Sequence, residues 1–99
     1  MKIRIPKLLL LVSLLFWMGC DSLEDKKGRF LLKGNKKMEE NDPKTALGFY
    51  EEAIALDSNF VDAYSSRGYA KNKLEDYKGA IADFSRYLLD ILATDFDIQ

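Results

Sequence analysis

A period of 34 residues runs through the chain from about residue 27 onward. Six pairs of residues of the same or similar type recur at this offset: Phe30 and Tyr64, Gly34 and Gly68, Asp42 and Asp76, Ala46 and Ala80, Leu47 and Ile81, and Tyr50 and Phe84. Repeats of this length fold as small units that bury their apolar faces against one another. The sequence therefore predicts two stacked units, residues 27–60 and 61–94. The alternative is a generic pair of helical hairpins whose spacing agrees by accident.

Each unit is predicted to be a pair of antiparallel helices. In the second unit, Tyr64, Gly68 and Lys71 are spaced by four and three residues and share one face of a helix from about Val61 to Leu74. Gly68 lets the partner helix approach closely, which offsets a helix-propensity cost of about 1 kcal/mol. The first unit repeats this plan, with Pro43 at the start of its second helix.

The last predicted helix, from about Tyr77, is apolar on more than one side. We expect its water-facing arc to hold Asp83, Arg86 and Asp90, and its inward stripe to be formed by Ala80, Ile81, Phe84, Leu88 and Ile91. A second stripe faces roughly the other way and consists of Leu89, Leu92 and Phe96. Because a contiguous exposed apolar patch marks an interaction site, this stripe is a candidate contact with a protein partner or a second copy. The alternative is that the tail, residues 95–99, folds back over it.

The stretch AYSSRGYAKNKLEDYKGAIADF, residues 63–84, resembles the tetratricopeptide repeat motif, and the resemblance covers nearly all of the chain from residue 27. It implies an all-α fold of two stacked helix-turn-helix hairpins, a fragment of an α-solenoid. The chain departs from the family where the first helices usually carry Leu and Tyr, because these positions hold Lys33, Lys37, Arg67 and Lys71.

The resemblance also implies a surface for a protein partner on the inner face of the first helices, where the family often holds extended peptides. By alignment, this face carries Asn35, Met38, Ser65, Tyr69 and Asn72. Amides, hydroxyls and an aromatic ring are side chains that hydrogen-bond and clamp a peptide backbone. The alternative is a groove that is merely solvated.

The first nineteen residues have the pattern of a signal peptide. Lys2, Arg4 and Lys7 precede an apolar run from Leu8 to Met18 that only Ser13 interrupts. Because a membrane-spanning helix needs about 20 apolar residues, this run is too short to cross a bilayer. A basic segment, a short apolar run and a small residue are typical of a secretory signal, here residues 1–19.

The end of this segment, WMGC, resembles the lipobox of bacterial lipoproteins, although the family prefers Leu and a small residue where Trp17 and Met18 stand. The resemblance implies cleavage after Gly19, a lipid on Cys20 and a tether over residues 20–26. It places the protein on the non-cytoplasmic side of the inner or the outer membrane of a bacterial cell envelope. The alternatives are an uncleaved signal anchor and a secreted protein with a free thiol.

The composition excludes several kinds of site. The chain has no His and one Cys, so it lacks the ligands of an ordinary zinc site and the base that a catalytic Cys requires. No glycine-rich phosphate loop is present. Without residues 1–19, three of the 15 basic residues are lost against 16 acidic ones, which leaves a net charge of −4 and argues against nucleic acid as a partner. We therefore expect no enzyme, catalytic residue, metal, cofactor or small-molecule substrate.

The sequence predicts a membrane-anchored lipoprotein whose repeats bind protein. Two alternatives remain at this point, namely a self-associating structural module without a specific ligand and an accessory subunit of an envelope enzyme. Mass measurements in solution would separate self-association from binding to a different protein.

Overall fold

The computed structural model describes residues 22–97. The predicted signal peptide, Gly19 and Cys20 lie outside this range. Within it, the chain forms four α-helices and no strand: α2 (Leu23–Glu39), α3 (Pro43–Leu56), α4 (Val61–Lys73) and α5 (Tyr77–Asp97). The all-α prediction is confirmed. None of these four helices combines the length and the apolar character that crossing a membrane requires.

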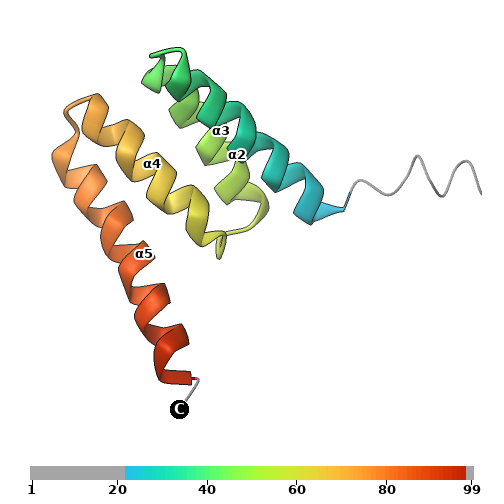
Figure 1. Ribbon diagram of the computed structural model, residues 1–99, viewed down its shortest axis with the longest axis vertical. Helices are drawn as coiled ribbons and strands as arrows, with labels where there is room; N and C mark the ends of the chain where they lie inside the picture. Colours follow the sequence, from blue (N-terminus) through green and yellow to red (C-terminus); the bar gives the residue numbers. More distant parts are fainter. Residues whose placement is uncertain (1–21, 98–99) are drawn as a thin grey trace, which may run out of the picture.

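The helices pack in chain order. Each contacts the next, α2 also touches α4, and α5 contacts only α4 among the described helices. Figure 1 shows α4 and α5 side by side and antiparallel, with the C-terminal half of α5 extending beyond the N-terminal end of α4. The array therefore has two ends, one formed by α2 and one by α5.

Polar side chains at three helix starts bind the first-turn N–H groups, which have no partner within the helix. The Oγ of Ser22 accepts from the Asp25 N–H at 3.3 Å, the Oδ1 of Asp42 from Thr45 at 3.2 Å, and the Oδ1 of Asp76 from Gly79 at 3.1 Å. The cap at Ser22 begins α2 at Leu23. Residues 23–26, which the sequence analysis assigned to a tether, are therefore helical.

The turns that follow α2 and α4 are built in the same way. Asn41 and Glu75 have φ values of 60° and 65°, a left-handed conformation that commonly ends a helix. The residue after each donates its N–H to the carbonyl five positions earlier, at 2.8 and 2.9 Å. Because Asn41 and Glu75 are 34 residues apart, the sequence period is also a period of this structure.

Small residues dominate the core. Ala46, Ala53, Ala63 and Ala70 are fully buried, and Tyr50 is the one large side chain of the described residues that is buried as completely. This composition follows from the close approach of neighbouring helices, which leaves room for little more than methyl groups.

Two glycines set this approach, and both face an aromatic ring of the next helix. A Cβ atom at Gly34 would lie 2.7 Å from Cδ1 of Tyr50, and one at Gly68 would lie 2.9 Å from Cε1 of Phe84. Both distances are shorter than van der Waals contact, so only glycine fits. The predicted role of Gly68 is confirmed, and Gly34 has the equivalent role in the first pair of helices.

The predicted inward side of α5 is confirmed for Ala80, which is buried, and for Phe84, which packs on Gly68, but it is wrong for Ile81, Leu88 and Asp83. Ile81 and Leu88 are 64% and 56% exposed, whereas Asp83, predicted to face water, is 3% exposed. Arg67 donates from Nε and Nη2 to the Asp83 carboxylate at 2.9 and 2.8 Å, and the Nζ of Lys71 lies 3.1 Å from it. Two cations of α4 thus bind this carboxylate where α4 packs on α5, while Ile81 and Leu88 have no following helix to cover them within the described residues.

The charges of this cluster stabilise one another. Burial by itself would raise the pKa of Asp83, but hydrogen bonds from Arg67 and Lys71 outweigh it and hold that pKa below its ordinary value. The same hydrogen bond raises the pKa of Arg67. The cluster therefore joins α4 to α5 as a buried ion pair, and removal of one partner leaves an uncompensated charge.

Candidate protein-binding surfaces

An open hollow of about 410 Å³ lies where the two pairs of helices, α2–α3 and α4–α5, meet. Its walls carry Asn35 and Met38 of α2 and Ser65 and Tyr69 of α4, and its complete lining is Asn35, Met38, Tyr50, Ser65, Ser66, Tyr69 and Phe84. Four of the five residues that the sequence placed on the inner face are therefore brought together. The fifth, Asn72, is exposed on α4 outside this lining.

The polar groups of the hollow are held in place by the core beneath it. The Tyr50 hydroxyl donates to Oδ1 of Asn35 at 2.7 Å, which fixes the orientation of the amide. Burial raises the pKa of Tyr50, so this hydroxyl stays protonated and acts as a donor at neutral pH. Since the bond uses the amide oxygen of Asn35, its NH₂ group is the part that can donate to a ligand.

The aromatic wall of the hollow is accessible to a ligand. Tyr69 is 49% exposed, and the Nζ of Lys73 lies 5.4 Å from the centroid of its ring. Such a cation steadies the ring without covering its whole surface. Met38 opposite is a flexible and polarisable side chain that adapts to different apolar groups. The hollow therefore offers hydrogen-bond donors beside an apolar clamp, which suits a peptide segment.

Sequence reasoning missed Tyr50, Ser66 and Phe84 as parts of this hollow. Tyr50 and Phe84 lie on α3 and α5, and their apolar spacing marked them as core residues alone. The 34-residue offset could have identified Tyr50 and Phe84, because it makes the two aromatic residues equivalent. Each of them packs on the glycine of the preceding helix.

A second candidate surface is the apolar face of α5, defined here as the exposed side chains of Tyr77, Ile81, Leu88, Leu89 and Leu92. The structure places the predicted stripe residues Leu89 and Leu92 on it. Phe96 belongs to α5 by its backbone, and its side chain lies outside the described part. Residues 95–97 continue the helix, so this portion of the predicted tail does not fold back over the stripe.

The face of α5 is wider than the sequence predicted, because it includes Ile81 and Leu88. Their equivalents 34 residues earlier, Leu47 and Ile54 on α3, are partly buried, and Leu47 packs against a core cluster that contains Ala70 of α4. The last helix thus exposes the kind of surface that α3 covers with α4. Comparing α3 with α5 position by position in the sequence would have predicted the exposure of Ile81 and Leu88.

These features define an all-α protein of helical hairpins with two exposed candidate binding surfaces. No protein-family model, curated protein or solved structure matches this chain. Within residues 22–97, no three His, Cys, Asp or Glu side chains gather closely enough to hold a metal ion.

Proposed function

We propose that this chain is a tetratricopeptide-repeat lipoprotein that binds a protein partner in the bacterial cell envelope. The observation that carries the binding role is the convergence of Asn35, Met38, Ser65 and Tyr69 in one open hollow. The repeat assignment is supported by the 34-residue recurrence of turns and of glycine–aromatic contacts. The membrane anchor is supported by the WMGC sequence that ends at Cys20.

The ligand that fits the hollow is an extended segment of another protein. The Asn35 NH₂ and the Ser65 hydroxyl donate to carbonyl groups of its backbone, while Met38 and Tyr69 enclose one apolar side chain. A hollow of about 410 Å³ has room for such a side chain and its backbone, but not for a folded domain. Asn72, on the same helix face as Tyr69, extends the surface along the segment.

Photo-crosslinking in the native envelope tests the binding role. A photoreactive side chain in place of Tyr69 is expected to capture one discrete protein. The same group in place of Lys44, which is exposed on α3, serves as the matched control and is expected to capture none. Equal capture at the two positions would show that the hollow is solvated surface without a ligand.

The anchor has its own test in the variant Cys20→Ser. Each buried methylene of an acyl chain adds about 0.8 kcal/mol to membrane binding, so a lipid on Cys20 holds the protein on membranes through salt washes. The variant is expected to lose the mass of the lipid and either leave the membrane fraction or remain uncut. An unchanged mass and fractionation would contradict lipidation.

Self-association is the second candidate function, and the apolar face of α5 favours it. The occupant would be the same face of a second copy, related by a two-fold axis, since such an interface uses one surface twice. Leu89→Asp together with Leu92→Asp is expected to leave the helices folded and to abolish a dimer in sedimentation velocity experiments. A wild-type chain that stays monomeric at high concentration would exclude this role.

A further inference from the structure

Positive charge is concentrated in α2. Helix α2 contains six basic and three acidic residues, the acidic ones near its two ends (Glu24, Asp25 and Glu39), whereas residues 41–97 contain six basic and eleven acidic residues. Lys27 and Lys37 are partly buried, and there Lys27 binds Asp57 at 2.6 Å and Lys37 binds Glu40 at 3.0 Å. The other four are exposed and recur at spacings of three and four, which places them on one side of the helix: Lys26, Arg29, Lys33 and Lys36. We refer to these four residues as the basic face of α2.

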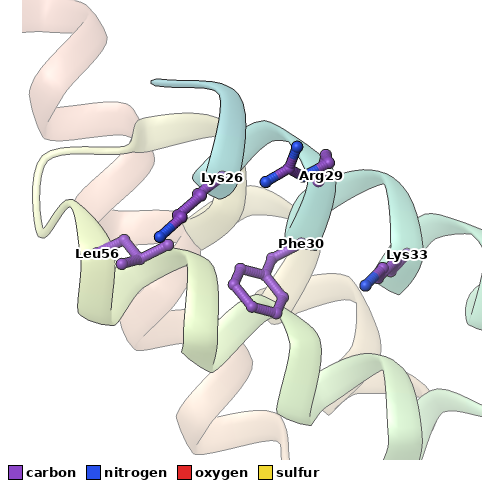
Figure 2. Close-up of a pocket in the computed structure, with 5 residues that line it drawn as sticks. All are labelled: Lys26, Arg29, Phe30, Lys33 and Leu56. Carbon is purple, nitrogen blue, oxygen red and sulfur yellow. The ribbon is translucent and has the colours of Figure 1, made fainter. Parts of the chain in front are cut away.

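The basic face surrounds a hollow of about 300 Å³ between α2 and α3. Figure 2 shows Lys26, Arg29 and Lys33 arranged along α2 around the ring of Phe30, with Leu56 of α3 across from Lys26. The Nζ of Lys33 lies 5.6 Å from the centroid of the Phe30 ring, which itself stacks on Phe49. The aromatic pair thus holds an ammonium group at the rim of the hollow.

The basic face stands at one end of the helix row and does not serve packing. Arg29 and Lys36 occupy the positions that Ala63 and Ala70 take on α4, where both alanines are fully buried. Within the described residues, the structure pairs neither Lys26 nor Lys33 with a carboxylate. The ammonium groups of Lys26 and Lys33 therefore face solvent, where a partner can reach them.

Exposed leucines border the basic face. Leu23 is three residues from Lys26, and Leu32 is three and four residues from Arg29 and Lys36, so each lies beside a cation on the helix surface. Cations flanked by exposed apolar side chains are typical of helices that lie on anionic membranes. This combination favours a membrane over a nucleic acid, because phosphate binding requires cations but gains nothing from exposed leucines.

We propose that the basic face of α2 rests on an anionic membrane surface and that the hollow at Phe30 receives the phosphate of a lipid headgroup. The inference rests on the membrane location in the proposed function, because α2 begins three residues after Cys20 and three residues span at most about 10 Å. The anchor thereby keeps the basic face beside the headgroups. Each exposed Lys or Arg near such a surface strengthens binding about fivefold.

The test compares binding of the full chain to vesicles of pure phosphatidylcholine and to vesicles that also contain phosphatidylglycerol. We expect Lys26→Gln with Lys33→Gln to weaken binding to the anionic vesicles about 25-fold at low salt and to leave binding to neutral vesicles unchanged. The matched control, Lys44→Gln with Lys78→Gln, removes two exposed lysines elsewhere and should have little effect. High salt should remove the difference.

Three outcomes would overturn the inference. The first is an equal loss in the two double variants, which would show an effect of net charge alone. The second is competition by millimolar inorganic phosphate, which would identify a site for the free anion. The third is tighter binding to a DNA duplex than to the anionic vesicles. The mass of the Cys20→Ser variant is independent of all three, so failure of the anchor and failure of this inference are distinguishable.

Discussion

The contact between Gly34 and Tyr50 makes a quantitative prediction for Gly34→Ala. The new methyl group would lie 2.7 Å from Cδ1 and 2.9 Å from Cζ of the Tyr50 ring. The ring has little freedom to move away, since Tyr50 is 1% exposed and its hydroxyl is bonded to Asn35. Overpacking of this kind costs about 1 to 3 kcal/mol.

A gain in helix propensity opposes this cost. Alanine is favoured over glycine inside a helix by about 1 kcal/mol, so the net loss for Gly34→Ala is about 0 to 2 kcal/mol. Gly28, in the same helix, supplies the control, because nothing lies within 4 Å of a Cβ atom built there. Gly28→Ala gains the propensity without the clash and should stabilise the protein by up to about 1 kcal/mol. Because both variants gain the same propensity, Gly34→Ala should be less stable than Gly28→Ala by the overpacking cost, about 1 to 3 kcal/mol.

Thermal unfolding followed by far-ultraviolet circular dichroism measures both effects. In a domain of this size, 1 kcal/mol shifts the midpoint by about 4 to 8 °C, so the two variants should be well separated. A Gly34→Ala variant that is as stable as Gly28→Ala would refute the packing of Tyr50 on Gly34. It would also remove the reason for the close approach of α2 and α3.

Two further predictions concern the buried cluster that joins α4 to α5. Asp83→Asn leaves Arg67 and Lys71 without their carboxylate. We expect the free energy of unfolding, measured in urea, to fall by about 3 kcal/mol. A fall near zero would mean that solvent screens the ion pair. The pKa of Asp83 is lowered in the folded state, so its contribution is present above the unfolded pKa of about 4 and is lost as the pH falls through the folded value. The stability of the wild type should therefore drop below about pH 4, and Asp83→Asn should flatten that drop; parallel curves would contradict this origin.

Local patterns accounted for the helices and their turns. Asp42 and Pro43 mark the start of α3, and the capping bond from Thr45 shows why, since the carboxylate accepts a first-turn N–H and the proline lacks one. Gly68 was likewise assigned from its spacing to Tyr64 and Lys71. These features depend on neighbours within a few residues, which a single sequence displays directly.

The burial of Asp83 in α5 depends on partners that are distant in sequence. Asp83 reads as a water-facing residue when its own helix is considered alone, because charged residues are almost never buried unless paired. Its partners Arg67 and Lys71 are 16 and 12 residues earlier, on α4. Only the packed pair of helices brings the three charges together, so the amphipathic pattern of α5 alone placed Asp83 on the wrong side.

The candidate hollow was predictable in part for a related reason. Asn35 and Ser65 were identified by alignment to a helix face, and the structure brings them to one hollow. Its floor was not identified, because Tyr50 belongs both to the core and to the surface of the site. The apolar spacing of such a residue in the sequence indicates its burial, and it does not reveal that the same side chain also lines a surface site.

The two ends of the helix row differ in character, and this difference limits how copies of the chain can meet. Head-to-tail stacking would press Lys36 of one copy against the exposed Ile81 and Leu88 of the next. Burying such a charge costs several kcal/mol, which offsets most of the roughly 3 to 6 kcal/mol that burial of two aliphatic side chains returns. The basic face of α2 therefore disfavours the open-ended fibre that an exposed apolar end would otherwise promote. The apolar face of α5 therefore suits a two-fold symmetric dimer or a contact with a different protein. This face lies at the end of the helix row opposite to the proposed membrane contact.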